Sequence, residues 1–268
     1  RAALTARTKA IMPVHYGGLA CPMGEVLAIA QEHGLKVVED AAHALPSTWQ
    51  GTLVGQLQSD ITVFSFYANK TMTTGEGGMA VTRHADLARR MRTMRLHGMS
   101  RDAFDRFTST TPAWYYEVVA PGFKYNLTDI AAAMGLQQLK KLPRFVARRQ
   151  QLADTYRTQL SGLPLVLPAD APPGDVHAWH LYVIRLTEAS PLARDAVIQA
   201  LSDRGIGTSV HYVPLHRHPY WRDRYQLTPQ MFPQADAAYL SMLSIPLYTA
   251  MVDADQQRVV DALQEVLG

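Results

Sequence analysis

The chain has 268 residues, of which 47% are hydrophobic and 18% are charged, enough apolar material for one large hydrophobic core or two smaller ones. Its formal net charge of +3 suits a small anionic substrate but falls well short of a nucleic-acid-binding surface, because the basic residues are scattered. The single cysteine, Cys21, excludes a disulfide within this sequence and favours a reducing cytoplasm, and no apolar run approaches membrane-spanning length.

The first half of the sequence alternates short apolar runs with helical patterns. Residues 1–9 are basic and lead directly into a strand-like run at 10–16, so we interpret them as the interior of a domain and not as a targeting signal. A helix is expected over 22–33, with Pro22 in its first turn and Gly34 at its C-terminal cap. Further elements are expected in the order strand 36–39, strand 60–66, strand 78–82 and helix 85–96. This alternation predicts a largely parallel sheet whose ligands bind at the carboxyl ends of the strands.

The second half has a different pattern. Thr128 can cap a helix that continues toward Lys141, with a kink or break expected at Pro143. The elements expected after it are helical residues 145–162, strand 179–186, helix 191–204, strand 207–212 and an amphipathic helix from Asp253. We therefore predict two domains: residues 1–145 as a larger α/β domain and residues 146–268 as a small α+β domain.

Lys70 is the most informative residue, because it follows an apolar strand and precedes the glycine-rich turn 71–78. A lysine that acts as a nucleophile needs a fixed, partly dry pocket in which its ammonium group loses a proton more easily. Asp40 and Ser65 also stand at the ends of predicted strands. An acid, a serine and a lysine at strand ends together indicate a site for pyridoxal phosphate (PLP), which a lysine carries as a Schiff base.

Seven segments resemble one known family, the DegT/DnrJ/EryC1/StrS aminotransferases, which use PLP and act on nucleotide-linked keto sugars. The segments, which extend over the entire chain, are residues 8–18, 37–44, 64–70, 75–78, 122–129, 205–212 and 244–248. The resemblance implies an α/β fold of fold type I, like that of aspartate aminotransferase. Such a fold has a mostly parallel sheet with helices on both faces and a small α+β C-terminal domain.

The resemblance also implies roles for individual residues. Lys70 would hold PLP and then move the proton between the substrate carbon and the cofactor. Asp40 would pair with the protonated pyridine nitrogen; without Lys70 it would be read as a helix N-cap. His43 would contact the ring or its 3-hydroxyl oxygen, and Ser65 would bind the phosphate. The structural alternatives are a loop histidine for His43 and simple strand packing for Ser65.

Two further residues come from the resemblance alone. Asn126 would reach across a dimer interface to the partner's PLP phosphate, which requires a homodimer with shared active sites; the alternative is a loop residue before a helix. His211 would face the substrate. No metal site is expected, because His216 and His218 lack a third ligand at convincing spacing.

The sequence departs from the family pattern in one respect. Members carry an additional N-terminal part of the large domain, which supplies a phosphate-binding turn at a helix N-terminus and an aromatic ring that stacks on PLP. Neither feature is present in these 268 residues. We expect the absence of this N-terminal part to weaken cofactor binding and to leave a sheet edge or an apolar face uncovered.

Three functional hypotheses follow. The first is an aminotransferase that moves an amino group from an amino acid, glutamate, to C4 of a nucleotide-linked keto sugar; within the family the nearest likeness is to the synthase of UDP-4-amino-4-deoxy-L-arabinose. Such a sugar would serve surface glycans, lipid A or natural products. The second is a PLP-dependent sugar dehydratase, a chemistry of relatives in which histidine replaces the lysine, so Lys70 argues against it. The third is a truncated, non-catalytic remnant of the fold.

Overall fold

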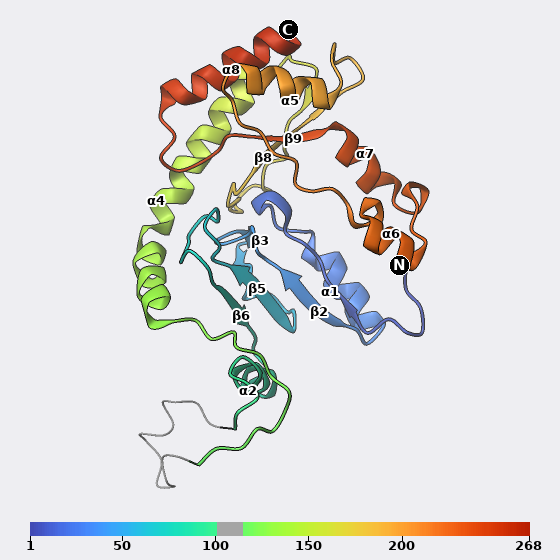
Figure 1. Ribbon diagram of the computed structural model, residues 1–268, viewed down its shortest axis with the longest axis vertical. Coiled ribbons are helices and arrows are strands. Elements are labelled where there is room, and N and C mark those ends of the chain that lie inside the picture. The colour runs from blue at the N-terminus through green and yellow to red at the C-terminus, as the bar shows by residue number, and fades with distance from the viewer. Residues whose placement is uncertain (101–114) are drawn as a thin grey trace. The chain divides into compact units, whose positions relative to one another are not determined.

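The structure, a computed structural model, describes residues 1–100 and 115–268 and divides into two compact units (Figure 1). The first unit contains Arg1–Tyr16, Ala20–Leu142 and Pro173–Val176. The second contains Gly17–Leu19, Pro143–Pro172 and His177–Gly268. None of the helices in the described ranges combines the length and the apolar character needed to cross a membrane.

The first unit is built on a four-stranded sheet in the order β1-β2-β5-β6 (Figure 1). The strands are β1 (Ala10–Ile11), β2 (Lys36–Asp40), β5 (Ile61–Ser65) and β6 (Gly78–Val81). The first three are parallel, as predicted, whereas β6 runs antiparallel to β5. A parallel neighbour would need a crossover, and the connection between β5 and β6 contains no helix, so the chain returns in the opposite direction.

The first predicted strand is shorter than expected. Residues 10–16 form only β1 and an isolated bridge between Val14 and Asp40. Pro13, between these two pairings, has no N–H to donate to a ladder. Its carbonyl still accepts a hydrogen bond from the Asp40 N–H at 2.9 Å, so the segment stays attached to the end of β2.

One face of this sheet is covered. Val37 of β2 and Phe64 of β5 point to the same side and are buried. Helix α1 (Met23–Glu32) packs on this side through Met23 and Ala30, and Figure 1 shows it next to β2. The predicted helix over 22–33 is thus confirmed, and it buries the apolar stripe that predicted it.

The opposite face of the same sheet is open. Met12, Val14 and Val63 lie on this side with 65%, 48% and 41% of their surface exposed. Asp40 and Ser65 belong to the same side of the sheet, because strand side chains alternate between faces.

A short hairpin in the first unit was not predicted. Strands β3 (Thr48–Trp49) and β4 (Thr52–Leu53) are joined by Gln50 and Gly51, which have φ angles of 51° and 75°. Both values lie in the left-handed region, as a tight two-residue hairpin turn requires. Asparagine or glycine at the first position of such a turn usually indicates a hairpin. This turn has Gln50 there, which does not.

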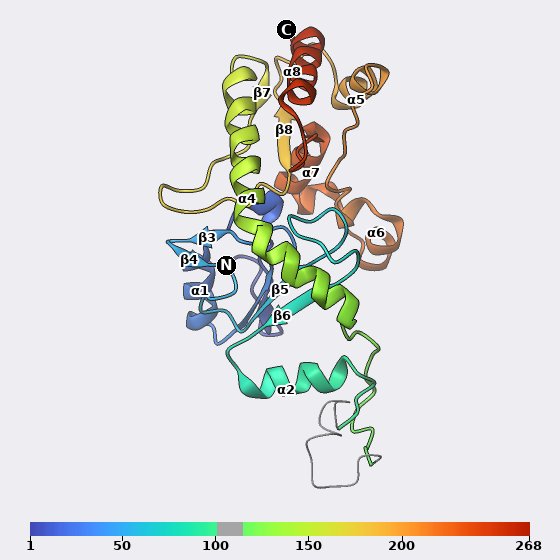
Figure 2. The same cartoon turned by 90° about the vertical axis from the view of Figure 1, so that its left-hand side faces the viewer.

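Two further helices follow the strands of this sheet along the chain. Helix α2 (Ala85–Met94) follows β6, close to its predicted range of 85–96. A kink or a break was predicted at Pro143, and of these two the break does not occur, because helix α4 (Asp129–Gln159) continues through this residue (Figure 2). Proline removes one hydrogen bond, to the carbonyl of Leu139, and the surrounding turns keep the helix intact. The part up to Leu142 belongs to the first unit and the part from Pro143 to the second.

The second unit is a three-stranded antiparallel sheet covered by helices. Its strands, in the order β7-β8-β9, are β7 (Leu165–Val166), β8 (Tyr182–Leu186) and β9 (Met242–Ile245). Its remaining helices are α5 (Arg194–Asp203), α6 (Pro219–Tyr225), α7 (Pro233–Ser241) and α8 (Asp253–Leu267). The core joins fully buried Tyr156, Ile184, Leu243 and Leu263, so the predicted amphipathic C-terminal helix is confirmed with its apolar stripe inward.

Two strand predictions in this unit need correction. The strand expected at 179–186 begins at Tyr182, because Trp179 has a φ of 46° that a strand does not accept. The strand expected at 207–212 is reduced to a bridge between Ser209 and Ser244. Strand β9 and helices α6 and α7 had no expected counterpart.

Candidate functional site

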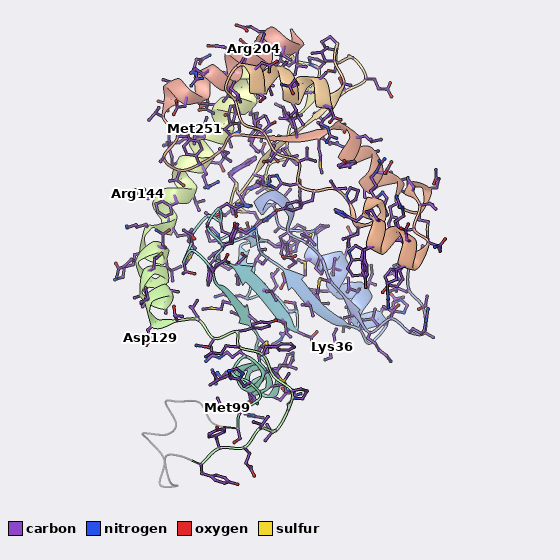
Figure 3. The ribbon with its side chains drawn as sticks, viewed as in Figure 1. Lys36, Met99, Asp129, Arg144, Arg204 and Met251 are labelled. Carbon is purple, nitrogen blue, oxygen red and sulfur yellow. The ribbon has the colours of Figure 1, made fainter. Side chains whose placement is uncertain are left out.

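Asp40 is the last residue of β2, at the carboxyl end of the parallel strands. Its Oδ1 accepts a hydrogen bond from the Ala42 N–H at 3.0 Å, as an acid at the start of a turn does. The opposite end of β2 begins with Lys36, labelled in Figure 3, whose ammonium lies 2.9 Å from Asp60. Each end of this strand therefore has a carboxylate, but only Asp40 lies where ligands of parallel sheets bind.

Lys70 lies in the loop that connects β5 with β6. The loop is closed by two hydrogen bonds of Phe66, whose N–H donates to the Gly77 carbonyl at 2.8 Å and whose carbonyl accepts the Thr74 N–H at 2.9 Å. A side chain at position 77 would overlap the Thr74 hydroxyl, so glycine is required for this closure. The residues after Lys70, Thr71 and Met72, are buried. The lysine is therefore fixed by a closed loop with buried anchors.

Lys70 and Asp40 influence each other electrostatically. Burial lowers the pKa of the Lys70 ammonium below its ordinary value, and the negative charge of Asp40 partly opposes that shift. A lysine with a lowered pKa has more of the neutral amine that reacts with an aldehyde. The structure thus brings together the two residues to which the sequence assigned the chemistry.

The lowered pKa predicts selective reactivity of Lys70. In the protein without PLP, we expect an amine-specific reagent to modify Lys70 at a lower pH than the exposed Lys140, because the neutral amine appears at lower pH. Asp40→Asn should move the Lys70 midpoint still lower, since the opposing charge is removed. Mass spectrometry of the modified protein over a pH series reports both lysines at once. Equal midpoints for Lys70 and Lys140 would contradict the prediction.

Ser65 and His43 lie in the same unit. Ser65 ends β5, and its Oγ accepts the Tyr67 N–H at 3.3 Å, so its hydroxyl hydrogen can be donated elsewhere. His43 is buried, with its ring centroid 6.1 Å from that of Tyr16. Their assigned contacts with the phosphate and the ring remain predictions.

Asn126 belongs to the first unit and His211 to the second. The Asn126 side-chain oxygen accepts a hydrogen bond from Lys124. The neighbouring Leu127 side chain lies next to Gly77, in the loop that contains Lys70. His211 belongs to the second unit, where its Nδ1 lies 2.8 Å from the Ser244 Oγ. The roles predicted for both residues, at a dimer interface and at the substrate, remain predictions.

Sequence reasoning missed two buried residues beneath Asp40. His15 and Glu39 are fully buried, and His15 Nε2 lies 2.8 Å from Glu39 Oε2. A signal was available, because Glu39 is a charged residue inside the apolar run that forms β2. Acids are almost never fully buried without partners, so this position required a buried donor.

The residues around Asp40 fit PLP. The aldehyde of that cofactor requires an amine, its ring nitrogen an acid and its phosphate hydrogen-bond donors. Lys70, Asp40 and Ser65 provide an amine, a carboxylate and a hydroxyl at one end of one sheet. No group of three or more metal-binding side chains occurs in the portion of the chain that the structure describes.

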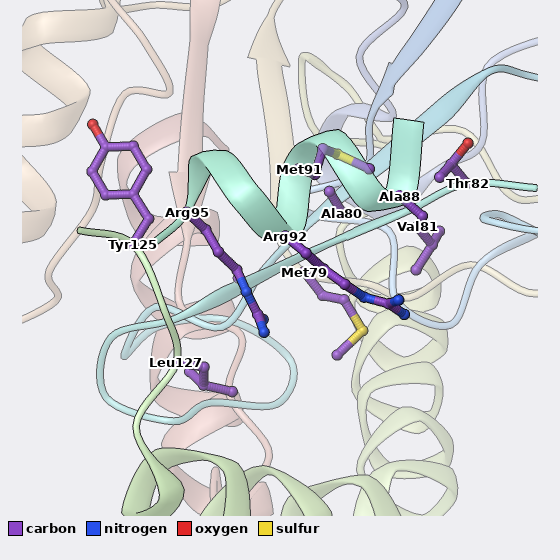
Figure 4. A pocket seen from close by; sticks show the side chains of 11 residues that line it. Met79, Ala80, Val81, Thr82, Ala88, Met91, Arg92, Arg95, Tyr125 and Leu127 are labelled. Atoms are coloured by element: carbon purple, nitrogen blue, oxygen red, sulfur yellow. The ribbon is translucent and has the colours of Figure 1, made fainter. Parts of the chain in front are cut away.

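A cavity of about 470 Å³ lies elsewhere in the first unit, between β6 and α2. Figure 4 shows Arg92 and Arg95 projecting from the same side of α2, with Tyr125 and Leu127 contributed by the segment before α4. None of the six residues predicted for the site lines it. We therefore do not assign it to the predicted chemistry.

Comparison with known proteins was made across the entire chain. The model of the DegT/DnrJ/EryC1/StrS aminotransferase family matches residues 1–264. The spore coat polysaccharide biosynthesis protein SpsC of Bacillus subtilis (strain 168) is 44% identical over 268 residues, which are 99% of this chain and 68% of SpsC.

Solved structures are similar over the same extent. Spr1654 of Streptococcus pneumoniae, assigned as a sugar aminotransferase, matches in its PMP form with a TM-score of 0.91 at 29% identity, covering 99% of this chain and 71% of that one. Its PLP form matches with a TM-score of 0.88 at 28% identity, covering 100% and 71%. PseC of Helicobacter pylori, an aminotransferase involved in the biosynthesis of pseudoaminic acid, matches with a TM-score of 0.90 at 28% identity. The match covers 99% of this chain and 68% of PseC.

Proposed function

The chain belongs to the DegT/DnrJ/EryC1/StrS aminotransferase family, and from this we propose that it transfers an amino group from glutamate to a nucleotide-linked keto sugar. Its fold is that of fold-type I enzymes and its cofactor is PLP, as the resemblance implied. The observation that carries the proposal is the pairing of Lys70, with its lowered pKa, and Asp40 at the carboxyl end of the sheet.

The proposed roles follow from where these side chains lie. Bound PLP supplies an aldehyde for a covalent link to an amine and a ring that withdraws electrons from the substrate carbon. The Lys70 Nζ would hold the cofactor through that link and, once free, would move the proton at the substrate carbon. Asp40 keeps a proton on the ring nitrogen.

The remaining contacts are assigned by the same reasoning. We propose that Ser65 donates its hydroxyl to the phosphate, that His43 contacts the ring, and that Asn126 binds the phosphate of a partner subunit. The active unit is then a homodimer with shared sites. His211 is proposed to face the sugar, and the division of the domains at residues 145 and 146 remains part of the proposal.

The substrate is the finer part of the proposal. SpsC is by name a protein of spore coat polysaccharide biosynthesis, and PseC acts in pseudoaminic acid biosynthesis, so both support a sugar destined for a glycan. The likeness to UDP-4-amino-4-deoxy-L-arabinose synthase supports amination at C4. With a single cysteine, we place the reaction in the cytoplasm.

The test is a two-substrate assay with PLP and glutamate. UDP-linked 4-keto pentose and a UDP-linked 3-keto sugar are supplied separately, and 2-oxoglutarate and the aminated sugar are measured together. We expect both products in equal amounts from the 4-keto sugar. Amination of the 3-keto sugar alone would contradict C4, and loss of a hydroxyl from the carbon next to the keto group, without an aminated sugar, would favour the dehydratase.

A further inference from the structure

A buried polar network lies beneath Asp40, on the covered face of the sheet. Its centre is the pair of fully buried side chains His15 and Glu39, with His15 Nε2 at 2.8 Å from Glu39 Oε2. Thr62 of β5 donates its hydroxyl to Glu39 Oε1 at 2.7 Å, and the Ser59 hydroxyl donates to the same oxygen. One carboxylate therefore collects three side-chain donors from two segments of the chain, one at His15 and one at residues 59–62.

These contacts define the charge of Glu39. Burial alone would raise the pKa of this carboxyl, but hydrogen bonds from His15, Ser59 and Thr62 outweigh burial and hold the pKa below its usual range. Glu39 is therefore an ionised carboxylate inside the fold. An ionised group in this position is tolerated only while its donors stay in place.

His15 donates to Glu39 in either of its protonation states. Its Nδ1 accepts a hydrogen bond from the Cys21 backbone N–H at 3.0 Å, which favours the neutral ring with the proton on Nε2. Burial also disfavours a second proton, whereas hydrogen bonds to the Cys21 side chain and Glu39 favour one and raise the pKa of His15 to about 9. The neutral ring and the doubly protonated ring differ only in whether Nδ1 carries a proton. Nε2 carries a proton in both forms.

The main chain connects this pair directly to Asp40. The His15 N–H donates to the Asp40 carbonyl at 3.0 Å, and the Asp40 N–H donates to the Pro13 carbonyl at 2.9 Å. On the other side, the Ala41 N–H donates to the Val63 carbonyl of β5 at 2.8 Å. Because Glu39 and Asp40 are consecutive in a strand, their side chains point to opposite faces. Whatever fixes Glu39 on one face therefore fixes the direction of Asp40 on the other.

We propose that His15 and Glu39 are positioning residues for the aminotransferase reaction, which hold the carboxyl end of β2 from below so that the Asp40 carboxylate meets the ring nitrogen of PLP. This inference rests on the proposed role of Asp40. Functional side chains need placement within about 0.5 Å, which requires supporting hydrogen bonds beneath them. Apolar packing at this position would fill the space, but it would not fix the strand through directed bonds.

The test is a double-mutant cycle measured by PLP affinity in a spectroscopic titration. His15→Phe keeps a ring but removes the donor to Glu39, and we expect a loss of PLP affinity of about tenfold, typical of a lost hydrogen bond to a charged group. His15→Gln, whose amide can donate to Glu39, should recover most of it. In an Asp40→Asn background, His15→Phe should cause little further loss, because coupled residues are non-additive.

Thr62→Val gives a second and milder variant, which removes one donor to Glu39 and keeps the side-chain shape. We expect about a threefold loss of PLP affinity, which again should vanish in the Asp40→Asn background. Equal losses with and without Asp40→Asn, for both His15→Phe and Thr62→Val, would overturn the inference while leaving the proposed function standing. No PLP binding by the unsubstituted protein would overturn the proposed function, and this inference with it.

Discussion

Replacing Lys70 by alanine is expected to abolish the covalent attachment of PLP and to slow amino transfer by at least about a thousandfold. In the proposed mechanism the side chain supplies both the amine that links the cofactor and the base that moves the substrate proton, so one substitution removes two functions. Lys70→Arg should fail equally, because a guanidinium group stays protonated and cannot form the link. The measurement is the visible absorption of protein-bound PLP before and after borohydride, together with the mass of the reduced protein.

The control for this experiment is Lys140→Ala, an exposed lysine on α4. The Lys140→Ala protein should keep the absorption band of bound PLP. After borohydride reduction, its mass should increase by that of one reduced PLP. A reducible band of equal strength in Lys70→Ala and in the unsubstituted protein would show that another amine carries the cofactor. The assignment of Lys70 would then be wrong.

Asp40→Asn has the second largest expected effect. Removing one partner of a buried charge pair costs about 3–5 kcal/mol, which corresponds to a rate lower by roughly a hundredfold to a few thousandfold. Asparagine fills the same space and can still accept the Ala42 N–H, so the strand end should stay in place. What is lost is the negative charge that keeps a proton on the ring nitrogen.

The rate should be measured in single turnovers with glutamate, which separate the chemical step from product release. Asp86→Asn, an acid in the first turn of α2, is the matched control and should change the rate by less than about twofold. An Asp40→Asn protein that binds PLP and reacts at the unsubstituted rate would mean that Asp40 is a structural turn residue. The structural alternative left open by the sequence was a helix N-cap, but a turn and not a helix follows Asp40.

The helices and strands that could be predicted are those with strong local signals. Helix α1 carries its apolar stripe, its proline at the start and its glycine after the end, and the structure places it within one residue of the prediction at each end. Strands β2 and β5 contain the β-branched and aromatic residues that favour strands, Val37 and Val38 in β2 and Ile61 to Phe64 in β5. Such elements depend on neighbouring residues alone, so a single sequence is sufficient.

The errors occurred where local and tertiary preferences differ. Pro143 is a helix-breaking signal, yet α4 continues through it, because the turns on either side supply the missing stability. The strand expected at 179–186 ignored Trp179, whose left-handed backbone is compensated by a close approach of Gly18 to residues 178–180. The compensation at Trp179 is not visible in the sequence, since Gly18 lies far away along the chain.

By itself, the sequence determined the family, the fold type, the cofactor and the choice of Lys70 and Asp40, because each depends on residue types in a fixed local order. Only the tertiary structure decided which charged side chains lie close enough to interact. The lowered pKa of Lys70 requires burial, and the carboxylate of Asp40, which partly opposes this shift, belongs to a different strand. Glu39 looked like an interruption of an apolar strand until His15, Ser59 and Thr62 were found around it. Burial and charge pairing are properties of distance in space, and for that reason the sequence could name the chemical groups but not their environment.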